Sequence, residues 1–222
     1  QLHSLDNAFN LEELEMWMNK ITKLLSSKIK EPLEKDKLSI IGELKIDGNA
    51  IALSYLNGVL VKAATRGNGI EGEDITNNIR TISSIPLRLL LNNPPPWLEV
   101  RGEAYIPNNI FDFINNERKV NGDDVFANPR NACAGTLRQL NPQIVASRQL
   151  DFFAYTIHFP EEWIPTSNDP NLPSSQWESL DWLKQAGFKV NPKAELLEGI
   201  NAIKFFFEKW EKKRHALAYD TD

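Results

Sequence analysis

Residues 38–66 read LSIIGELKIDGNAIALSYLNGVLVKAATR, and this run decides the fold. Three segments within it, at 38–46, 50–56 and 59–66, are rich in the apolar and β-branched residues that are typical of strands. The second and third segments are joined by Asn57-Gly58, a dipeptide typical of two-residue hairpins. We therefore expect an antiparallel pair of strands directly after the first strand.

Lys45 lies at the end of the first predicted strand, between the acids Glu43 and Asp47. Side chains two residues apart on a strand point to the same face, so the pattern predicts carboxylate, amine and carboxylate side by side. The apolar run that precedes Lys45 predicts a buried strand, and lysines are rarely buried unless they are paired or reactive. Gly48 then lets a backbone or a ligand approach closely. The triplet suits a nucleophile, although K-x-D-G strings also arise by chance where a strand runs into a turn.

The rest of the chain alternates helices with a few strands. A first helix is predicted near 11–27, because Asn10 and Glu13 resemble a capping box. Further helices are predicted from Asp74 or Ile75 to before Pro86, from Pro107 to about 119, and near 130–139, 175–187 and 197–213; further strands are predicted at 97–105 and 151–159. This order of elements favours an α+β fold with an antiparallel sheet.

Composition narrows the classes of function. The 222 residues are 41% hydrophobic, which suits one large domain or a domain with an appendage. No run approaches the roughly 20 apolar residues of a membrane helix. The net charge of −5 argues against a free-standing DNA-binding module. The single cysteine, Cys133, excludes an internal disulfide and a cysteine-based zinc site, and the three histidines lack ligand spacing.

A glycine-rich string, Thr65-Arg66-Gly67-Asn68-Gly69, follows the predicted hairpin. Such a loop could wrap a phosphate or a sugar, with Arg66 supplying positive charge. The G-K-[ST] ending of a P-loop is missing, and a hairpin precedes the string, so it is not a dinucleotide-binding fingerprint. Taken alone, a surface loop explains the string equally well.

Two further pairs of charged residues stand out. Arg101 and Glu103 share one face of a predicted strand, so they either form an exposed ion pair or leave Glu103 to bind a ribose hydroxyl. Arg130 and Arg138 lie on one predicted helix, where they either bind phosphates or are simply solvated.

Taken together and in order, these strings resemble the adenylation domain of bacterial NAD-dependent DNA ligases. The K-x-D-G element is shared by the whole nucleotidyltransferase superfamily, whereas T-R-G-x-G and N-P-R-N-x-x-x-G-x-L-R are specific to the NAD-dependent branch. The resemblance runs from one end of the chain to the other, through residues 4–7, 43–48, 65–74, 101–103, 128–140, 152–155 and 214–222.

The resemblance implies a nucleotidyltransferase fold of the ATP-grasp-like kind shared by DNA ligases and mRNA-capping enzymes, with antiparallel sheets flanked by helices. It implies that Lys45, with Asp47 as its catalytic neighbour, attacks the α-phosphorus of NAD, releases nicotinamide mononucleotide and becomes lysyl-AMP. The AMP then passes to the 5′-phosphate of nicked double-stranded DNA, and the 3′-hydroxyl displaces it. Mg²⁺ is expected because phosphoryl transfer requires charge neutralisation, although no metal cage of protein ligands is visible.

The resemblance also assigns roles to other residues. Glu43 would recognise adenine, with Leu5 and Tyr155 as nearby walls and Ser4 in the same cofactor-binding set, and Glu103 would hold the ribose. From the residues alone, Tyr155 could instead be a core aromatic. The residues that would contact phosphates or the DNA backbone are Arg66, Arg130, Arg138 and Arg214.

Two parts of the family pattern are not found in residues 1–222. The subdomain that binds nicotinamide mononucleotide should precede Ser4, and Asp222 matches only the first residue of the D-G-V-V-I-K element. We therefore expect an incomplete adenylation domain, which alone cannot ligate DNA and scarcely adenylates itself from NAD. The protein is expected to be a monomer in the bacterial cytoplasm, with NAD and nicked DNA as partners and no membrane association.

Two rival hypotheses remain open at this stage. One is an ATP-dependent DNA or RNA ligase or a capping-type transferase, because these share K-x-D-G and the same chemistry. The other is a non-catalytic module that binds nucleotide or DNA, in which Lys45 would be dispensable.

Overall fold

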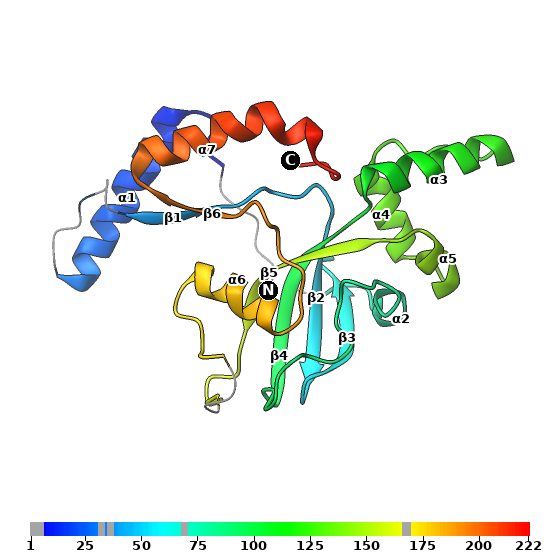
Figure 1. Ribbon diagram of the computed structural model, residues 1–222, viewed down its shortest axis with the longest axis horizontal. Helices are drawn as coiled ribbons and strands as arrows, with labels where there is room; N and C mark the ends of the chain where they lie inside the picture. Colours follow the sequence, from blue (N-terminus) through cyan, green and yellow to red (C-terminus); the bar gives the residue numbers. More distant parts are fainter. Residues whose placement is uncertain (1–6, 31–33, 35–37, 68–70, 166–169) are drawn as a thin grey trace. The chain divides into compact units, whose positions relative to one another are not determined.

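The computed structural model of the chain describes residues 7–30, 34, 38–67, 71–165 and 170–222. These residues form two compact units (Figure 1). The larger unit contains Lys45–Pro192 and Leu217–Asp222. The smaller unit contains the described part of His3–Leu44 together with Lys193–Ala216.

The larger unit is built on a four-stranded antiparallel sheet. Its strands are β2 (Asn49–Leu56), β3 (Val59–Thr65), β4 (Trp97–Tyr105) and β5 (Asp151–His158), in the order β3-β2-β4-β5. Alternate strand residues are buried because successive side chains point to opposite faces. The fully buried ones include Ile51, Leu53, Leu98 and Val100. The prediction of an α+β fold with antiparallel sheets is confirmed.

The predicted hairpin forms at Asn57-Gly58, which connects β2 to β3. Both residues have positive φ, 46° and 76°, as a type I′ turn requires. A side chain at position 58 would also meet Pro94, at 2.8 Å. Glycine is therefore needed here for both its backbone conformation and its size.

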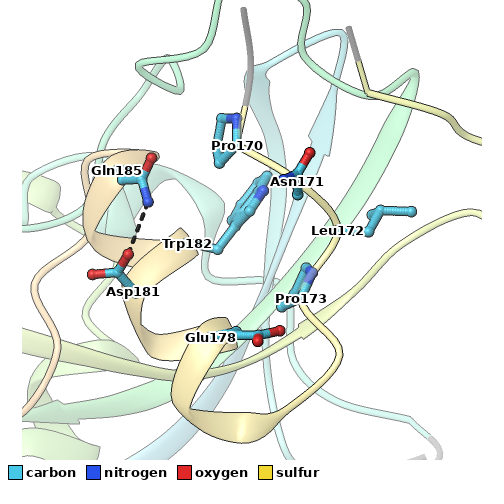
Figure 2. A pocket seen from close by; sticks show the side chains of 8 residues that line it. All are labelled: Pro170, Asn171, Leu172, Pro173, Glu178, Asp181, Trp182 and Gln185. Atoms are coloured by element: carbon cyan, nitrogen blue, oxygen red, sulfur yellow. Dashed lines mark hydrogen bonds between the residues drawn. The ribbon is translucent and has the colours of Figure 1, made fainter. Parts of the chain in front are cut away.

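Helices surround this sheet. The helix α6 (Gln176–Gln185) packs against β5, and the short α2 (Thr76–Ile79) packs against β3 (Figure 1). The remaining helices of the unit are α3 (Asn108–Asn121), α4 (Pro129–Leu137) and α5 (Pro142–Ser147). Beside α6 there is a hollow of about 570 Å³ (Figure 2), and its lining contains none of the predicted site residues; it consists of Pro170, Asn171, Leu172, Pro173, Glu178, Asp181, Trp182 and Gln185.

The smaller unit pairs β1 (Ser39–Gly42) with β6 (Glu195–Glu198) in antiparallel register. Its helices are α1 (Leu11–Ile29), α7 (Gly199–Lys213) and the 3₁₀ turn Arg214–Ala216. The capping box of α1 forms as predicted, since the Asn10 side chain accepts from the Glu13 backbone at 2.9 Å. The Glu13 carboxylate in turn accepts a hydrogen bond from the Phe9 backbone N–H at 2.8 Å.

The predicted strand 38–46 is wrong in its second half. The ladder with β6 ends where Gly42 faces Glu195, and Ile46 then forms an isolated bridge with Thr221. The chain therefore changes its pairing partner between these two residues, which leaves residues 43–45 outside any strand. The strand that would have placed Glu43, Lys45 and Asp47 on one face is not formed.

Two other helices have different bounds from those predicted, and a third helix was not predicted. The helix expected from Asp74 to before Pro86 is only Thr76–Ile79, because Asp74 instead bridges Ala64. The helix expected at 197–213 begins at Gly199, because Leu197 and Glu198 belong to β6. The helix Pro142–Ser147 was not predicted.

Candidate active site

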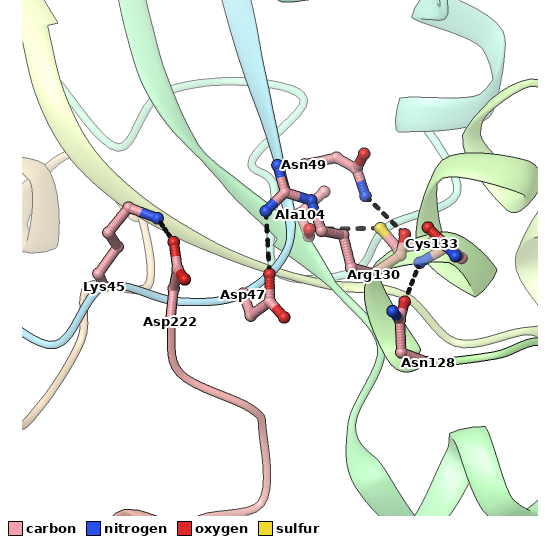
Figure 3. A network of polar contacts seen from close by, with 9 residues as sticks. Lys45, Asp47, Asn49, Ala104, Asn128, Arg130, Cys133 and Asp222 are labelled. Atoms are coloured by element: carbon pink, nitrogen blue, oxygen red, sulfur yellow. Dashed lines mark hydrogen bonds and ion pairs between the residues drawn. The ribbon is translucent and has the colours of Figure 1, made fainter. Parts of the chain in front are cut away.

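Lys45 and the end of the described chain lie side by side in the larger unit. Ile46 bridges Thr221, the Asp222 backbone N–H donates to the Lys45 carbonyl at 2.9 Å, and the Asp47 N–H donates to the Asp220 carbonyl at 2.9 Å. This antiparallel contact places the Lys45 ammonium against the Asp222 carboxylate, with which it forms an ion pair (Figure 3).

The burial predicted for Lys45 is wrong. Its side chain is 52% exposed, because the residue lies beyond the end of β1 and outside a sheet interior. The amine is therefore accessible to a substrate while a carboxylate holds it in place. A reactive lysine needs both accessibility and a defined position.

Asp47 connects this segment to α4. Its carboxylate accepts from Arg130 at 3.1 Å (Figure 3). Arg130 is in the first turn of α4, which begins where the Asn128 side chain caps the Asn131 N–H at 2.8 Å. The Arg130 carbonyl in turn accepts from the Asn49 side chain at 3.0 Å. Arg130 is thus fixed at both its backbone and its guanidinium.

Glu103 lies on β4, opposite Ala50 of β2. Burial raises the pKa of its carboxyl to about 7, although the positive charges of Arg130 and Lys45 act in the opposite direction. Gly48 provides the space for Glu103. A side chain at position 48 would lie 2.2 Å from the Ala104 carbonyl and 2.9 Å from Glu103 Cγ.

Tyr155 belongs to the same charged region. Burial raises the pKa of its hydroxyl to about 12, and the negative charge of Glu103 adds to that increase while Arg101 and Arg66 oppose it. The residue is only half-buried, unlike Phe152 and Phe153, which are in the core. The assignment of Tyr155 to the nucleotide, and the alternative that it is a core aromatic, both stay open.

Arg101 does not use Glu103 as its ion-pair partner on the strand face. Its guanidinium pairs with Glu99 at 2.7 Å, and the register between β4 and β5 shifts between Arg101 and Gly102. The open alternative of an Arg101–Glu103 pair is thus replaced by an Arg101–Glu99 pair.

The glycine-rich string is held closed at its base. The Thr65 N–H donates to the Glu73 carbonyl at 3.0 Å, and the Glu73 N–H donates to the Thr65 hydroxyl at 3.0 Å. Arg66 begins this loop, next to Ala50, whose carbonyl accepts from the Arg66 N–H at 3.2 Å. Asn68 and Gly69 of the string lie outside the described residues.

Arg138 lies at the far end of α4 from Arg130. Its guanidinium pairs with Glu73 at 2.6 Å, and both side chains are more than half exposed. The buried Asn78 fixes this end of the helix, since its side-chain amide donates to the Leu137 carbonyl at 2.8 Å and to the Gln139 carbonyl at 2.7 Å. Arg138 therefore joins α4 to the base of the glycine-rich loop.

The structure does not test the remaining predicted residues. Glu43 and Arg214 belong to the smaller unit. Ser4 and Leu5 lie outside the described residues. Their roles stay predictions.

Sequence reasoning missed three residues of the site. Asn49 bonds to Arg130, 81 positions away, and Asn78 bonds to Leu137, 59 positions away. No local sequence pattern indicates contacts over such distances. Asp222 was recognised as part of a motif but not as the partner of Lys45, which is 177 positions away. Only the fold reveals these contacts.

Among the described residues, no three His, Cys, Asp or Glu side chains gather closely enough to hold a metal ion. None of the helices in the described ranges has the length and apolar character needed to cross a membrane.

An accessible lysine paired with a carboxylate, next to a second carboxylate fixed by an arginine and at the end of an antiparallel sheet, is the arrangement expected of a nucleotidyltransferase. Comparison with known proteins agrees. The family model of the NAD-dependent DNA ligase adenylation domain matches residues 1–222, and the chain belongs to this family.

Similar proteins are found among cyanobacterial DNA ligases. The chain is 61% identical to a DNA ligase of Prochlorococcus marinus (strain NATL1A) and 58% identical to one of Synechococcus sp. (strain WH7803), over 221 residues in each case. These matches cover 100% of this chain but 32% and 31% of the two relatives. The chain thus spans about a third of the length of the curated relatives it matches.

Proposed function

We propose that this chain contributes Lys45, the residue that receives AMP, to the adenylation step of an NAD-dependent DNA ligase. The observation that carries the proposal is the position of Lys45, whose exposed amine is held by the Asp222 carboxylate beside the Asp47–Arg130 pair. Family membership supports NAD as the AMP donor. The names of the relatives support nicked DNA as the acceptor.

The reaction forms a phosphoramidate bond. The Lys45 ammonium first loses one proton to water, which leaves the neutral amine. The amine donates its lone pair to the α-phosphorus of NAD, and the bond between that phosphorus and the bridging oxygen breaks. The electron pair of that bond leaves with nicotinamide mononucleotide. The second proton that Nζ loses goes to the carboxylate hydrogen-bonded to it, that of Asp222.

Glu103 and Tyr155 are the side chains best placed to bind the nucleoside. Both are partly buried; burial raises the pKa of the Glu103 carboxyl while the charges of Lys45 and Arg66 act to lower it, and the charges of Glu103 and Arg66 act on the pKa of the Tyr155 hydroxyl. We assign the ribose hydroxyls to Glu103 and one face of the adenine to Tyr155. Adenine recognition by Glu43, and the parts of Ser4 and Leu5, remain proposals that rest on the family pattern.

Arginines supply the positive charge that phosphates require. Arg130 and Arg138 lie at opposite ends of α4, and Arg66 begins the glycine-rich loop. We assign Arg66 to the cofactor and Arg130, Arg138 and Arg214 to phosphates of the cofactor or the nick. Each would stabilise the charge that develops during phosphoryl transfer.

Mg²⁺ is part of the proposal. Mg²⁺ commonly binds through one or two carboxylates together with the phosphates of its substrate. Glu103, whose charge interacts with that of Lys45, would be such a carboxylate. When bound, the ion would neutralise charge on the phosphate. We further propose a monomer in the bacterial cytoplasm, where chromosomal DNA is repaired.

Intact mass spectrometry of the full-length protein tests this function. Incubation with NAD and Mg²⁺ should add the mass of one AMP, and incubation with ATP and Mg²⁺ should not. Loading by ATP alone would instead favour an ATP-dependent ligase or a capping-type transferase. The absence of loading by either nucleotide would favour a non-catalytic module.

A further inference from the structure

The segment that carries Asp222 is anchored by a cluster of three aromatic rings. Tyr219 is 7% exposed and packs edge-on against Tyr105 and Phe153, with centroid distances of 5.4 Å to each. Tyr105 and Phe153 are themselves stacked at 5.1 Å. They belong to the adjacent strands β4 and β5, so Tyr219 is seated on the sheet itself.

The two rings beneath Tyr219 are held in turn by the partly exposed ion pair of Asp151 and Lys189. The Tyr105 hydroxyl donates to Asp151 at 2.8 Å. Lys189 forms an ion pair with Asp151 and lies 4.9 Å from the centre of the Phe153 ring. The seat for Tyr219 is therefore rigid, because each ring has both an apolar and a polar contact.

Backbone contacts on both sides of Tyr219 transmit this anchoring to the site. On one side, the Ala218 carbonyl accepts from the Asn108 N–H at 2.9 Å. On the other, the Asp220 carbonyl accepts from the Asp47 N–H, and the Asp222 N–H donates to the Lys45 carbonyl. Tyr219 is the buried aromatic side chain of this segment, and Asp220 and Asp222 are exposed.

We propose that Tyr219, seated on Tyr105 and Phe153, is a positioning residue that holds Asp222 against Lys45. This inference rests on the proposed function for its catalytic consequence, and it adds a residue whose side chain touches no substrate. Displacing the segment would leave Lys45 without the carboxylate that orients its amine and accepts its proton. A misplacement of about 1 Å can cost on the order of 100-fold in rate.

Three variants of the full-length protein test the proposal. Tyr219→Ala removes the anchor, and Leu60→Ala is the control. Tyr219→Phe keeps the ring and loses only the 3.3 Å hydrogen bond that the Tyr219 hydroxyl donates to Asn191. Leu60 is 3% exposed in the same unit and lies on β3 beside the hairpin, where it pairs with Tyr55. Its truncation should lower the melting temperature without affecting the site.

The first readout is hydrogen exchange at the backbone amides of Asp47 and Asp222, which requires no enzymatic activity. Tyr219→Ala should accelerate exchange at both amides at least about tenfold, whereas Tyr219→Phe and Leu60→Ala should not. Unchanged protection in Tyr219→Ala would overturn the proposal. This result stands even if the wild-type protein loads no AMP, in which case the proposed function fails separately.

The second readout is the rate of AMP loading from NAD in a double-mutant cycle with Asp222→Asn. Alone, Tyr219→Ala should slow loading roughly 10- to 100-fold and Tyr219→Phe less than about twofold. In the Asp222→Asn background, Tyr219→Ala should cost less than about twofold, because both changes remove one function. Full additivity of the two losses would show that Tyr219 acts by another route and would overturn the proposal.

Discussion

Burial on β4 raises the pKa of the Glu103 carboxyl to about 7, above the ordinary value of 4.5 for a glutamate. The folded protein therefore binds more protons than the unfolded chain between about pH 4.5 and 7. In that interval the free energy of unfolding falls as the pH rises. At about 1.4 kcal/mol per pKa unit, the decrease due to Glu103 would approach 3 kcal/mol.

Glu103→Gln should remove this part of the pH dependence. Urea unfolding of the variant, followed at several pH values between 4 and 8, should show a flatter dependence than the wild type. Glu117→Gln serves as the control, because Glu117 is exposed on α3 and should leave the dependence unchanged. A variant of Glu103 as pH-dependent as the wild type would contradict the assigned burial effect.

Several site residues could be predicted from the sequence because the family strings are local. Lys45, Asp47, Glu103 and Arg130 were found in this way, and the structure brings them together. The partnership of Lys45 with Asp222 could not be predicted, because it depends on an antiparallel contact between distant segments. The exposure of Lys45 has the same cause, since it depends on where β1 ends.

At the scale of elements, the features that depend on neighbouring residues were predicted correctly, whereas the strand that depends on long-range pairing was not. The capping box of α1, the hairpin at Asn57-Gly58 and the strand at 97–105 each follow from a few neighbouring residues. The strand Glu195–Glu198 was missed because its four residues form a strand only through pairing with β1. The same pairing explains why the first strand is shorter than its apolar run predicts.

Gly48 sets the distance between the Lys45 segment and β4. Gly48→Ala should destabilise the protein by about 2 kcal/mol or more, because the added carbon would lie 2.2 Å from the backbone oxygen of Ala104 in β4. Gly135→Ala is the matched control. Its added carbon would meet only Phe126, at 3.4 Å, and alanine favours the helix, so stability should change by less than about 1 kcal/mol.

Thermal and urea unfolding of the two glycine variants distinguish these expectations. A wild-type midpoint for Gly48→Ala would contradict the close approach of residue 48 to β4. A large loss of stability for Gly135→Ala would show that an added methyl group is harmful even where there is space for it. The effect of Gly48→Ala could then not be attributed to the close approach to β4.

At the scale of the whole molecule, a net charge of −5 must be reconciled with the proposed binding to DNA. The proposed contacts with DNA phosphates are made by arginines at the two ends of α4, Arg130 and Arg138. Each phosphate contact releases counterions, so it contributes to the salt dependence of affinity. The overall charge then matters less than the position of these side chains.

Arg138→Ala in the full-length protein should weaken binding to nicked DNA and reduce the slope of log affinity against log salt by about 1. Fluorescence anisotropy at four or five salt concentrations measures both quantities. Lys184→Ala removes the same formal charge from the exposed side of α6 and should leave the slope unchanged. Equal slopes for wild type and Arg138→Ala would exclude Arg138 as a phosphate contact.

The central claim is that Lys45 receives AMP from NAD, and peptide mass spectrometry after incubation with NAD and Mg²⁺ tests it most directly. We predict that the AMP adduct lies on Lys45 and that Lys45→Ala abolishes it while the protein remains folded. An adduct on another residue, or undiminished loading of Lys45→Ala, would contradict the account.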